Sequence, residues 1–464
     1  MSKHYDLLVI GSGPSGQRAA VQAAKLGRSV AVIERKSQIG GNAVHRGTVP
    51  SKTLRETVLN LSGWRERGFY GRAYRVKQHI TTADLQQRLQ ITLDHEIEVM
   101  KHQLMRNGVE VIPGEAHFRD AHTLEVSESR DSDPEQYSAD YIVIGVGTRP
   151  HRPEHIPFDG CKIIDSDDIL AIDPLPRTMA VVGGGVIGIE YATIFSALDI
   201  NVTVVEAREK LLDFIDQEIM QEFQHHVRDR GMILRTGEQV SDCRVDADGK
   251  VITQLASGRR VVTDLAMFAA GRQGNTDSLA LENAGLEADK RGRLTVNEYF
   301  QTDVSHIYGV GDVIGFPAQA STSMEQGRRA ARHALTGEPQ KRLQSFPVGI
   351  YSVPEISMAG RTEDELKAAG VPFESGIARF RETARGQILG LQEGMLKMLF
   401  SLEDHKLLGV HVEGEGATEL VHIGHAVMEL GGPLEYFIES VFNYPTLAEA
   451  YKVAALDAWN RLSR

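Results

Sequence analysis

Short, uninterrupted apolar runs alternate with helix-forming stretches through the first half of the chain. Residues 7–10 and 29–33 have the length and composition of buried parallel strands, and the strongly helical stretch 18–25 lies between them. The same order returns further on, where apolar residues 179–182 and 201–205 flank a second helix-forming stretch. Strands that alternate with helices form a parallel sheet, so the pattern predicts an α/β protein with two such folds.

The rest of the chain shows other patterns. Residues 80–107 form a long, mostly helix-forming segment. Two apolar stretches, 124–126 and 141–144, flank a polar loop, which indicates a hairpin extension. The turn signals at 246–250 and 256–259 predict a further antiparallel insert. From about residue 343 the pattern changes to that of an α+β domain without glycine triplets.

A glycine motif joins the first strand to the first helix. Gly11, Gly13 and Gly16 form G-x-G-x-x-G, in which the glycines allow a tight turn, close approach of a ligand, and packing of helix on strand. Backbone N–H groups at the helix start would face a pyrophosphate with the helix dipole behind them. Glu34 ends the next strand, where its carboxylate can accept hydrogen bonds from a ribose diol. The order predicts a bound dinucleotide.

The motif occurs again about 170 residues later. Gly183, Gly185 and Gly188 follow an apolar strand, and Glu206 ends the strand after the helix. Two complete motifs predict two bound dinucleotides. Glu206 favours a free ribose 2′-hydroxyl over a 2′-phosphate, whereas the Arg208 guanidinium could pair with that phosphate. The two residues together predict that NADH is preferred and NADPH is tolerated.

Composition restricts the partners. A net charge of -12 without a compensating basic block excludes nucleic acid as an expected partner. No apolar run approaches the ~20 residues of a membrane span, and the start of the chain has no signal-peptide pattern, so we expect a cytoplasmic protein. At 464 residues, two or three domains are expected. His422 and His425 lack further ligands nearby, so no metal site is predicted.

The segment 39–52 reads Ile-Gly-Gly-Asn-Ala-Val-His-Arg-Gly-Thr-Val-Pro-Ser-Lys. It resembles the active-site segment of the flavoprotein disulfide reductases, G-G-x-C-x-x-x-x-C-x-P-S-K, but Ala43 and Thr48 stand at the two cysteine positions. A dithiol relay needs a thiolate that attacks a disulfide sulfur, which neither side chain can provide. The only cysteines, Cys161 and Cys243, lie elsewhere in the sequence and read as ordinary thiols.

Within that family, the chain resembles the soluble pyridine nucleotide transhydrogenases over essentially its full length. The resemblance rests on 47–52, 271–279 and 443–446, where threonine and tyrosine replace the second cysteine and the late histidine. The first cysteine is commonly kept in these relatives, so Ala43 is a departure. The resemblance implies two Rossmann-like dinucleotide-binding domains, for FAD and NAD(P), and a C-terminal α+β dimerisation domain. The implied domains are the FAD-binding segments 1–150 and 275–342, the NAD(P)-binding domain 151–274, and the dimerisation domain 343–464.

The resemblance also implies roles for individual residues. Lys52 and Glu190 would form an ion pair beside flavin N5. Tyr444 and Glu449 would take the places of the late acid–base pair. Asp312, in a motif at 307–312, would bind the ribityl chain. Further residues expected to contact the cofactors are Arg35, Gly41, Thr48, Ser51, Gly147, Gly271 and Gly311.

The activity implied is ping-pong hydride transfer between NADPH and NAD+ through one tightly held FAD, in a homodimer or larger assembly. An NADH diaphorase or quinone reductase would use the same motifs, and a non-catalytic redox-sensing flavoprotein would bind the same cofactors. Ala43 and Thr48 all but exclude a dithiol enzyme such as lipoamide dehydrogenase or glutathione reductase. The sequence leaves open the physiological direction, the final electron acceptor and the balance between Glu206 and Arg208.

Overall fold

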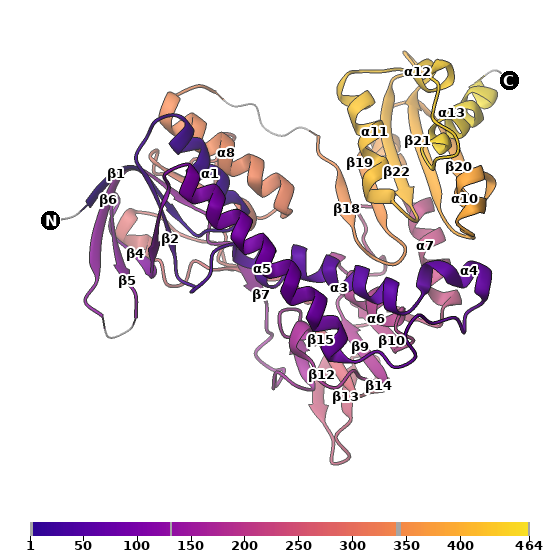
Figure 1. The fold of residues 1–464 in the computed structure, drawn as a ribbon, viewed down its shortest axis with the longest axis horizontal. Helices are drawn as coiled ribbons and strands as arrows, with labels where there is room; N and C mark the ends of the chain where they lie inside the picture. Colours follow the sequence, from indigo (N-terminus) through magenta and orange to yellow (C-terminus); the bar gives the residue numbers. More distant parts are fainter. Residues whose placement is uncertain (1–2, 130–131, 340–344, 463–464) are drawn as a thin grey trace. The chain divides into compact units, whose positions relative to one another are not determined.

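The computed structural model describes residues 3–129, 132–339 and 345–462 (Figure 1). The chain forms two compact units. The first unit combines Met1–Thr53, Gln86–His151 and Gly271–Leu343. The second combines Leu54–Leu85, Arg152–Ala270 and Gln344–Arg464. The predicted α/β class is confirmed, because each unit holds a sheet in which parallel strands alternate along the chain with helices.

The first unit is built on a mixed sheet of seven strands in the order β3-β2-β1-β6-β5-β4, with β17 also paired to β6. Its central strands carry consecutive buried apolar residues, as expected for a sheet covered on both faces. The β4–β5–β6 part is antiparallel and forms the predicted hairpin extension. The strands are β1 (Lys3–Ile10), β2 (Val30–Glu34), β3 (Glu110–Pro113), β4 (Glu115–Asp120), β5 (Thr123–Ser127), β6 (Glu135–Ile144) and β17 (Ile307–Gly309).

Helices α1 (Pro14–Lys25) and α8 (Ala320–Thr336) pack side by side in this unit (Figure 1). Their close approach requires Gly327, because a Cβ there would lie 1.9 Å from the Ser15 carbonyl oxygen. The 3-10 helix η4 (Gly311–Ile314) precedes α8. The other elements here are α2 (Gly41–His45), the start of α3 (Thr48–Leu61), most of α5 (Thr82–Arg106), the pair β7 (Thr148–Pro150) and β16 (Arg272–Gly274), and η3 (Leu281–Ala284).

The second unit contains a five-stranded parallel sheet in the order β11-β10-β9-β15-β8. Helices α6 (Val186–Ser196) and α7 (Gln217–Asp229) connect its strands. The predicted insert is the antiparallel sheet β12-β13-β14. The strands are β8 (Ile163–Asp165), β9 (Thr178–Val182), β10 (Asn201–Glu206), β11 (Ile233–Thr236), β12 (Val240–Val245), β13 (Val251–Leu255), β14 (Arg260–Thr263) and β15 (Leu265–Phe268).

The C-terminal part of this unit is an antiparallel sheet in the order β18-β19-β22-β21-β20, against which α11 (Ala417–Glu429) and α13 (Glu449–Leu462) pack. This is the α+β arrangement expected beyond residue 343. The strands are β18 (Val348–Ile350), β19 (Ile356–Gly360), β20 (Phe373–Arg379), β21 (Met395–Ser401) and β22 (Leu407–Glu413). Shorter helices are η1 (Trp64–Glu66), α4 (Arg67–Tyr70), η2 (Asp168–Ala171), α9 (Glu363–Ala368), η5 (Phe380–Glu382), α10 (Ala384–Ile388) and α12 (Leu434–Glu439).

The helix expected at 80–107 is α5, so that prediction is confirmed. Within the described part of the chain, none of the helices has the length and apolar character that a membrane crossing needs. The division into four domain segments stays a prediction. The two compact units are drawn differently, because they place Leu54–Leu85 with the second unit rather than the first.

Candidate functional site

The first glycine motif lies between β1 and α1 in the first unit. Gly11 has φ +100°, and a Cβ there would come within 2.6 Å of the Gly145 carbonyl oxygen. A Cβ at Gly16 would lie 1.9 Å from the Gly11 carbonyl oxygen. Both glycines are therefore required by the turn and by helix–strand packing, as the motif predicts.

Gly13 differs from its neighbours, because the fold itself does not need a glycine there. Its φ of -66° suits any residue, and a Cβ would meet only Gly41 Cα at 4.0 Å. Gly13 is also the N-cap of α1, whose first turn has neither a side-chain cap nor an acidic residue. Open space over a helix start without a side-chain cap fits the pyrophosphate of a dinucleotide.

Glu34 ends β2 and reaches the glycine loop. Its Oε2 accepts hydrogen bonds from Ser12 N at 3.0 Å and Ser12 Oγ at 2.6 Å, and its Oε1 accepts one from Lys36 N at 2.9 Å. The carboxylate is 8% exposed as a residue and held beside the motif, where a ribose would lie. Arg35 points elsewhere, since its guanidinium lies 3.6 Å from the Glu115 carboxylate and is half exposed.

Four segments far apart in the sequence meet near Asp312. Arg272 donates from Nε to Thr148 Oγ1 at 2.7 Å and from Nη2 to the Thr148 carbonyl at 2.8 Å. The Asn42 amide donates to the same carbonyl. Burial raises the pKa of Asp312 above its ordinary value, while the positive charge of Arg272 acts in the opposite direction. Sequence reasoning named Asp312 but missed Arg272, Thr148 and Asn42, for which no spacing rule exists.

Asp312 is positioned by its own neighbours. Gly311 has φ +78°, and its N–H donates to Gln326 Oε1 at 2.8 Å. Ser323 Oγ lies 3.4 Å from Asp312 Oδ1. The predicted glycines Gly147 and Gly271 also have positive φ, at +64° and +99°, which explains why glycine stands in these two turns.

The segment with the missing cysteines forms α2 and the start of α3. Ala43 is partly exposed on α2, and Thr48 is exposed at the first position of α3. Gly41, at φ +59°, lies against Gly13, since a Cβ on Gly41 would be 2.8 Å from Gly13 Cα. Ser51 is buried and accepts a hydrogen bond from Lys52 Nζ at 3.2 Å. Cys161 and Cys243 are free and belong to the second unit, so this segment contains no sulfur.

The second glycine motif repeats the first between β9 and α6. Gly183 has φ +112°, and a Cβ there would lie 2.4 Å from the Ala269 carbonyl oxygen. A Cβ at Gly188 would lie 1.9 Å from the Gly183 carbonyl oxygen. At Gly185, with φ -77°, a Cβ would meet nothing within 4 Å. Gly185 thus corresponds to Gly13. The start of α6, which has no side-chain cap, fits a second pyrophosphate.

Glu206 ends β10 and receives several hydrogen bonds. Its Oε2 accepts one from Gly184 N at 2.6 Å, and its Oε1 accepts two from Arg208, from the backbone N at 2.9 Å and from Nε at 3.0 Å. Burial opposes ionisation, but the hydrogen bonds from Arg208 and Gly184 prevail and lower the pKa of Glu206. The structure therefore pairs Glu206 directly with Arg208. From the sequence, these two residues are expected to have opposite effects on the binding of a 2′-phosphate.

Glu190 lies on α6 and is 4% exposed as a residue. Its Oε1 accepts a hydrogen bond from the Tyr351 backbone N–H at 2.9 Å, and one turn further Thr193 Oγ1 accepts one from Val353 N at 3.0 Å. These two bonds attach the segment 351–353 to α6. Sequence reasoning missed this second role of Glu190, because Tyr351 lies 161 residues further along the chain.

Tyr444 and Glu449, in the places of the late acid–base pair, lie near the end of the second unit. Tyr444 is 68% exposed, and Glu449 is the first residue of α13. The Oε2 atom of Glu449 is buried without a hydrogen-bond partner. Among the described residues, no group of three His, Cys, Asp or Glu side chains could hold a metal ion.

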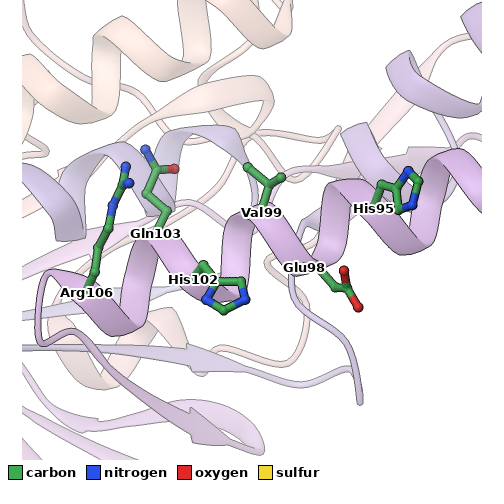
Figure 2. A pocket seen from close by; sticks show the side chains of 6 residues that line it. All are labelled: His95, Glu98, Val99, His102, Gln103 and Arg106. Atoms are coloured by element: carbon green, nitrogen blue, oxygen red, sulfur yellow. The ribbon is translucent and has the colours of Figure 1, made fainter.

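A separate depression lies along one face of α5 (Figure 2). Its lining residues all come from successive turns of this helix and include none of the predicted cofactor contacts. They are His95, Glu98, Val99, His102, Gln103 and Arg106.

Residues 5–327 match the family described as pyridine nucleotide-disulphide oxidoreductase, and residues 346–455 match the dimerisation domain of that family. The chain belongs to the pyridine nucleotide-disulphide oxidoreductase family. The family predicted from the segment 39–52 and the glycine motifs is thus confirmed.

Relatives named soluble pyridine nucleotide transhydrogenase align with almost the whole chain. One from Mycobacterium bovis (strain BCG / Pasteur 1173P2) is 53% identical and covers 99% of this chain and 98% of its own length. One from Salmonella paratyphi B is 44% identical with the same coverage. These alignments confirm the resemblance to that group.

Solved structures show the same fold. The HOCl-induced flavoprotein disulfide reductase RclA from Escherichia coli has a TM-score of 0.87 at 25% identity, covering 97% of this chain and 99% of its own. LpdA from Mycobacterium tuberculosis has a TM-score of 0.89 at 24% identity, covering 98% and 99%.

Proposed function

We propose that this protein is an FAD-dependent pyridine nucleotide transhydrogenase that moves hydride between NADPH and NAD+ without a redox disulfide. One observation carries the proposal. Both dinucleotide motifs keep a glycine that the fold does not require, Gly13 and Gly185, whereas Ala43 and Thr48 occupy the sulfur positions. The protein can bind two dinucleotides but cannot relay electrons through a dithiol.

The relatives support this function. Proteins named soluble pyridine nucleotide transhydrogenase share 53% and 44% of their residues with this chain over nearly full length. The matched length, 461 or 462 residues, is almost the whole chain. FAD is the cofactor, and NAD(H) and NADP(H) are the substrates.

Bound FAD would supply a ring that takes a hydride equivalent from one nicotinamide and gives it to another. The protein contributes binding and orientation. The uncapped start of α1 and Glu34 would hold the pyrophosphate and adenosine ribose of FAD, and Asp312 its ribityl chain. Arg272 fixes Thr148 and the turn before β7, which stiffens the wall of this site.

Lys52 and Glu190 are proposed to act closest to the reacting atoms. The Lys52 ammonium would bring positive charge to the flavin ring, where it favours the added electrons. Glu190 is fixed at one oxygen by Tyr351, which sets the orientation of its carboxylate. Tyr444 and Glu449 are proposed to stand where dithiol enzymes have an acid–base pair, without a thiol to protonate.

The matched dimerisation domain indicates self-association, and we propose a homodimer. Its described surface exposes Val441 at 94% and Leu430 at 88%, together with Tyr444. Apolar side chains this exposed are typical of an interface between subunits. We also propose that the protein works in the cytoplasm, where both nicotinamide pools are available to it.

An acceptor comparison tests the function. NADPH oxidation should proceed with thio-NAD+ as acceptor, and double-reciprocal plots at several fixed acceptor concentrations should be parallel, because a single site serves both nucleotides in turn. Rapid reduction of a quinone with no measurable reduction of thio-NAD+ would instead assign an NADH-type diaphorase. A protein that binds both nucleotides and turns over neither acceptor would be a redox sensor.

A further inference from the structure

The loop 207–216 connects β10 to α7 and carries Arg208 beside the second dinucleotide motif. The backbone of Arg208 is fixed at both ends, since its N–H donates to Glu206 Oε1 at 2.9 Å and its carbonyl accepts from Gly237 N at 2.9 Å. Any movement of its charge must therefore come from the side chain. That side chain is 48% exposed.

The guanidinium of Arg208 lies between two carboxylates. Nε and Nη2 donate to Glu206 at 3.0 and 3.4 Å, and Nη1 donates to Asp213 Oδ1 at 3.3 Å. Glu206 alone would leave Nη1 available. Asp213 accepts from Nη1 and so holds the guanidinium beside Glu206 at the end of β10.

The position of Asp213 is set by the loop that carries it. Leu211 and Leu212 are buried, and Leu212 has φ +44°, a conformation that a leucine keeps only where the surroundings enforce it. Three residues after Asp213, Asp216 caps α7 by accepting from Glu218 N at 3.1 Å and binds buried Lys397 at 2.9 Å. Asp213 therefore projects from a backbone anchored on both sides.

The first dinucleotide motif offers an internal comparison. Glu34 and Glu206 occupy the same place in the two motifs, and each accepts a hydrogen bond from the backbone N–H two residues on, Lys36 or Arg208. The residue five positions after this N–H donor is Gly41 in the first motif and Asp213 in the second. The adenosine ribose of FAD carries no 2′-phosphate, and no acid stands at that place in its motif.

We propose that Asp213 is a specificity-determining residue that holds Arg208 in the arrangement suited to an unphosphorylated ribose. A 2′-phosphate binds only when the guanidinium leaves both carboxylates and pairs with the phosphate. Asp213 opposes that movement and also repels the phosphate charge. The inference rests on the proposed function, since it assigns the choice between NAD(H) and NADP(H) to a restraint on Arg208.

The test measures binding of NADP+ and NAD+ to the flavin-loaded protein by calorimetry, so that no turnover is needed. Asp213→Asn should lower the Kd for NADP+ by about twofold to fivefold, the worth of an exposed ion pair, and leave the Kd for NAD+ nearly unchanged. Asp213→Lys should lower the NADP+ value further. The shift should shrink as salt is raised, because the charges are half exposed.

Asp242→Asn is the matched control. Asp242 is a similarly exposed acid that pairs with Arg244, two residues away on β12, at 2.8 Å. Its removal changes the net charge equally and should leave both Kd values unchanged. Equal shifts for NADP+ and NAD+ in Asp213→Asn, or no shift for either, would overturn the inference while leaving the proposed function intact. Failure of the unaltered protein to bind either nucleotide would overturn the proposed function itself.

Discussion

Replacement of Gly185 by alanine is expected to leave the protein folded and to reduce kcat/KM for NADPH and NADH alike by about a hundredfold. The glycine has φ -77°, and an added Cβ would meet nothing within 4 Å, so the fold accepts a methyl group. The methyl would stand where the pyrophosphate must approach the start of α6, and both nucleotides would lose their position. Steady-state kinetics with thio-NAD+, alongside a melting curve, measures both parts of the expectation.

Gly188→Ala provides the contrast within the same motif. An added Cβ at Gly188 would lie 1.9 Å from the Gly183 carbonyl oxygen, so helix and strand must separate. This variant should melt at a lower temperature, whereas Gly185→Ala should not. If Gly185→Ala retains normal kinetics for both nucleotides, the second motif does not hold the substrate as described.

The second large effect is expected from Lys397, which lies on β21 and is fully buried. Its ammonium contacts Asp216 Oδ1 at 2.9 Å, Glu218 Oε2 at 3.0 Å and Glu363 Oε1 at 2.6 Å. Burial opposes ionisation of Asp216, but the positive charge and the hydrogen bond of Lys397 lower its pKa, so the carboxylate stays charged. Lys397→Met removes the ammonium that these three carboxylates share, and only the contact of Glu363 with Lys367 is kept at this cluster among the ion pairs of the described residues. The variant should lose about 3 to 5 kcal/mol of the free energy of unfolding, measured as a large drop in the thermal midpoint.

Lys367→Met is the control, because Lys367 shares a partner with Lys397. It contacts Glu363 Oε2 at 2.7 Å, but its side chain is 61% exposed. An exposed pair of this kind contributes about 0 to 1 kcal/mol, so its loss should barely change the midpoint. Equal midpoints for the two variants would show that the buried cluster does not stabilise the second unit.

The glycine motifs and their acids could be predicted from sequence because local geometry dictates their spacing. A strand, a tight turn and a helix place the carboxylate of the next strand beside the turn, and Glu34 and Glu206 both lie there. The apolar runs predicted the parallel strands for a similar reason, since strands covered on both faces have few polar residues.

The contacts that depend on tertiary structure could not be predicted in this way. Arg272 reaches Thr148 across 124 positions of sequence, and Tyr351 reaches Glu190 across 161. The restraint on Arg208 by Asp213 is local, but it depends on the path of a loop that contains a leucine at positive φ. Neither hydrophobic periodicity nor motif spacing carries information about such paths.

The central claim is that hydride passes between two nicotinamides through a flavin with no sulfur in series. Anaerobic titration of the flavin-loaded protein with NADPH tests it most directly, because the flavin absorbance counts the electrons taken up. With no cysteine in the segment 39–52, a single equivalent of NADPH should bleach each flavin, and NAD+ added afterwards should restore the colour and form an equal amount of NADH. Uptake of a second equivalent, or a flavin that stays bleached when NAD+ is added, would contradict the account.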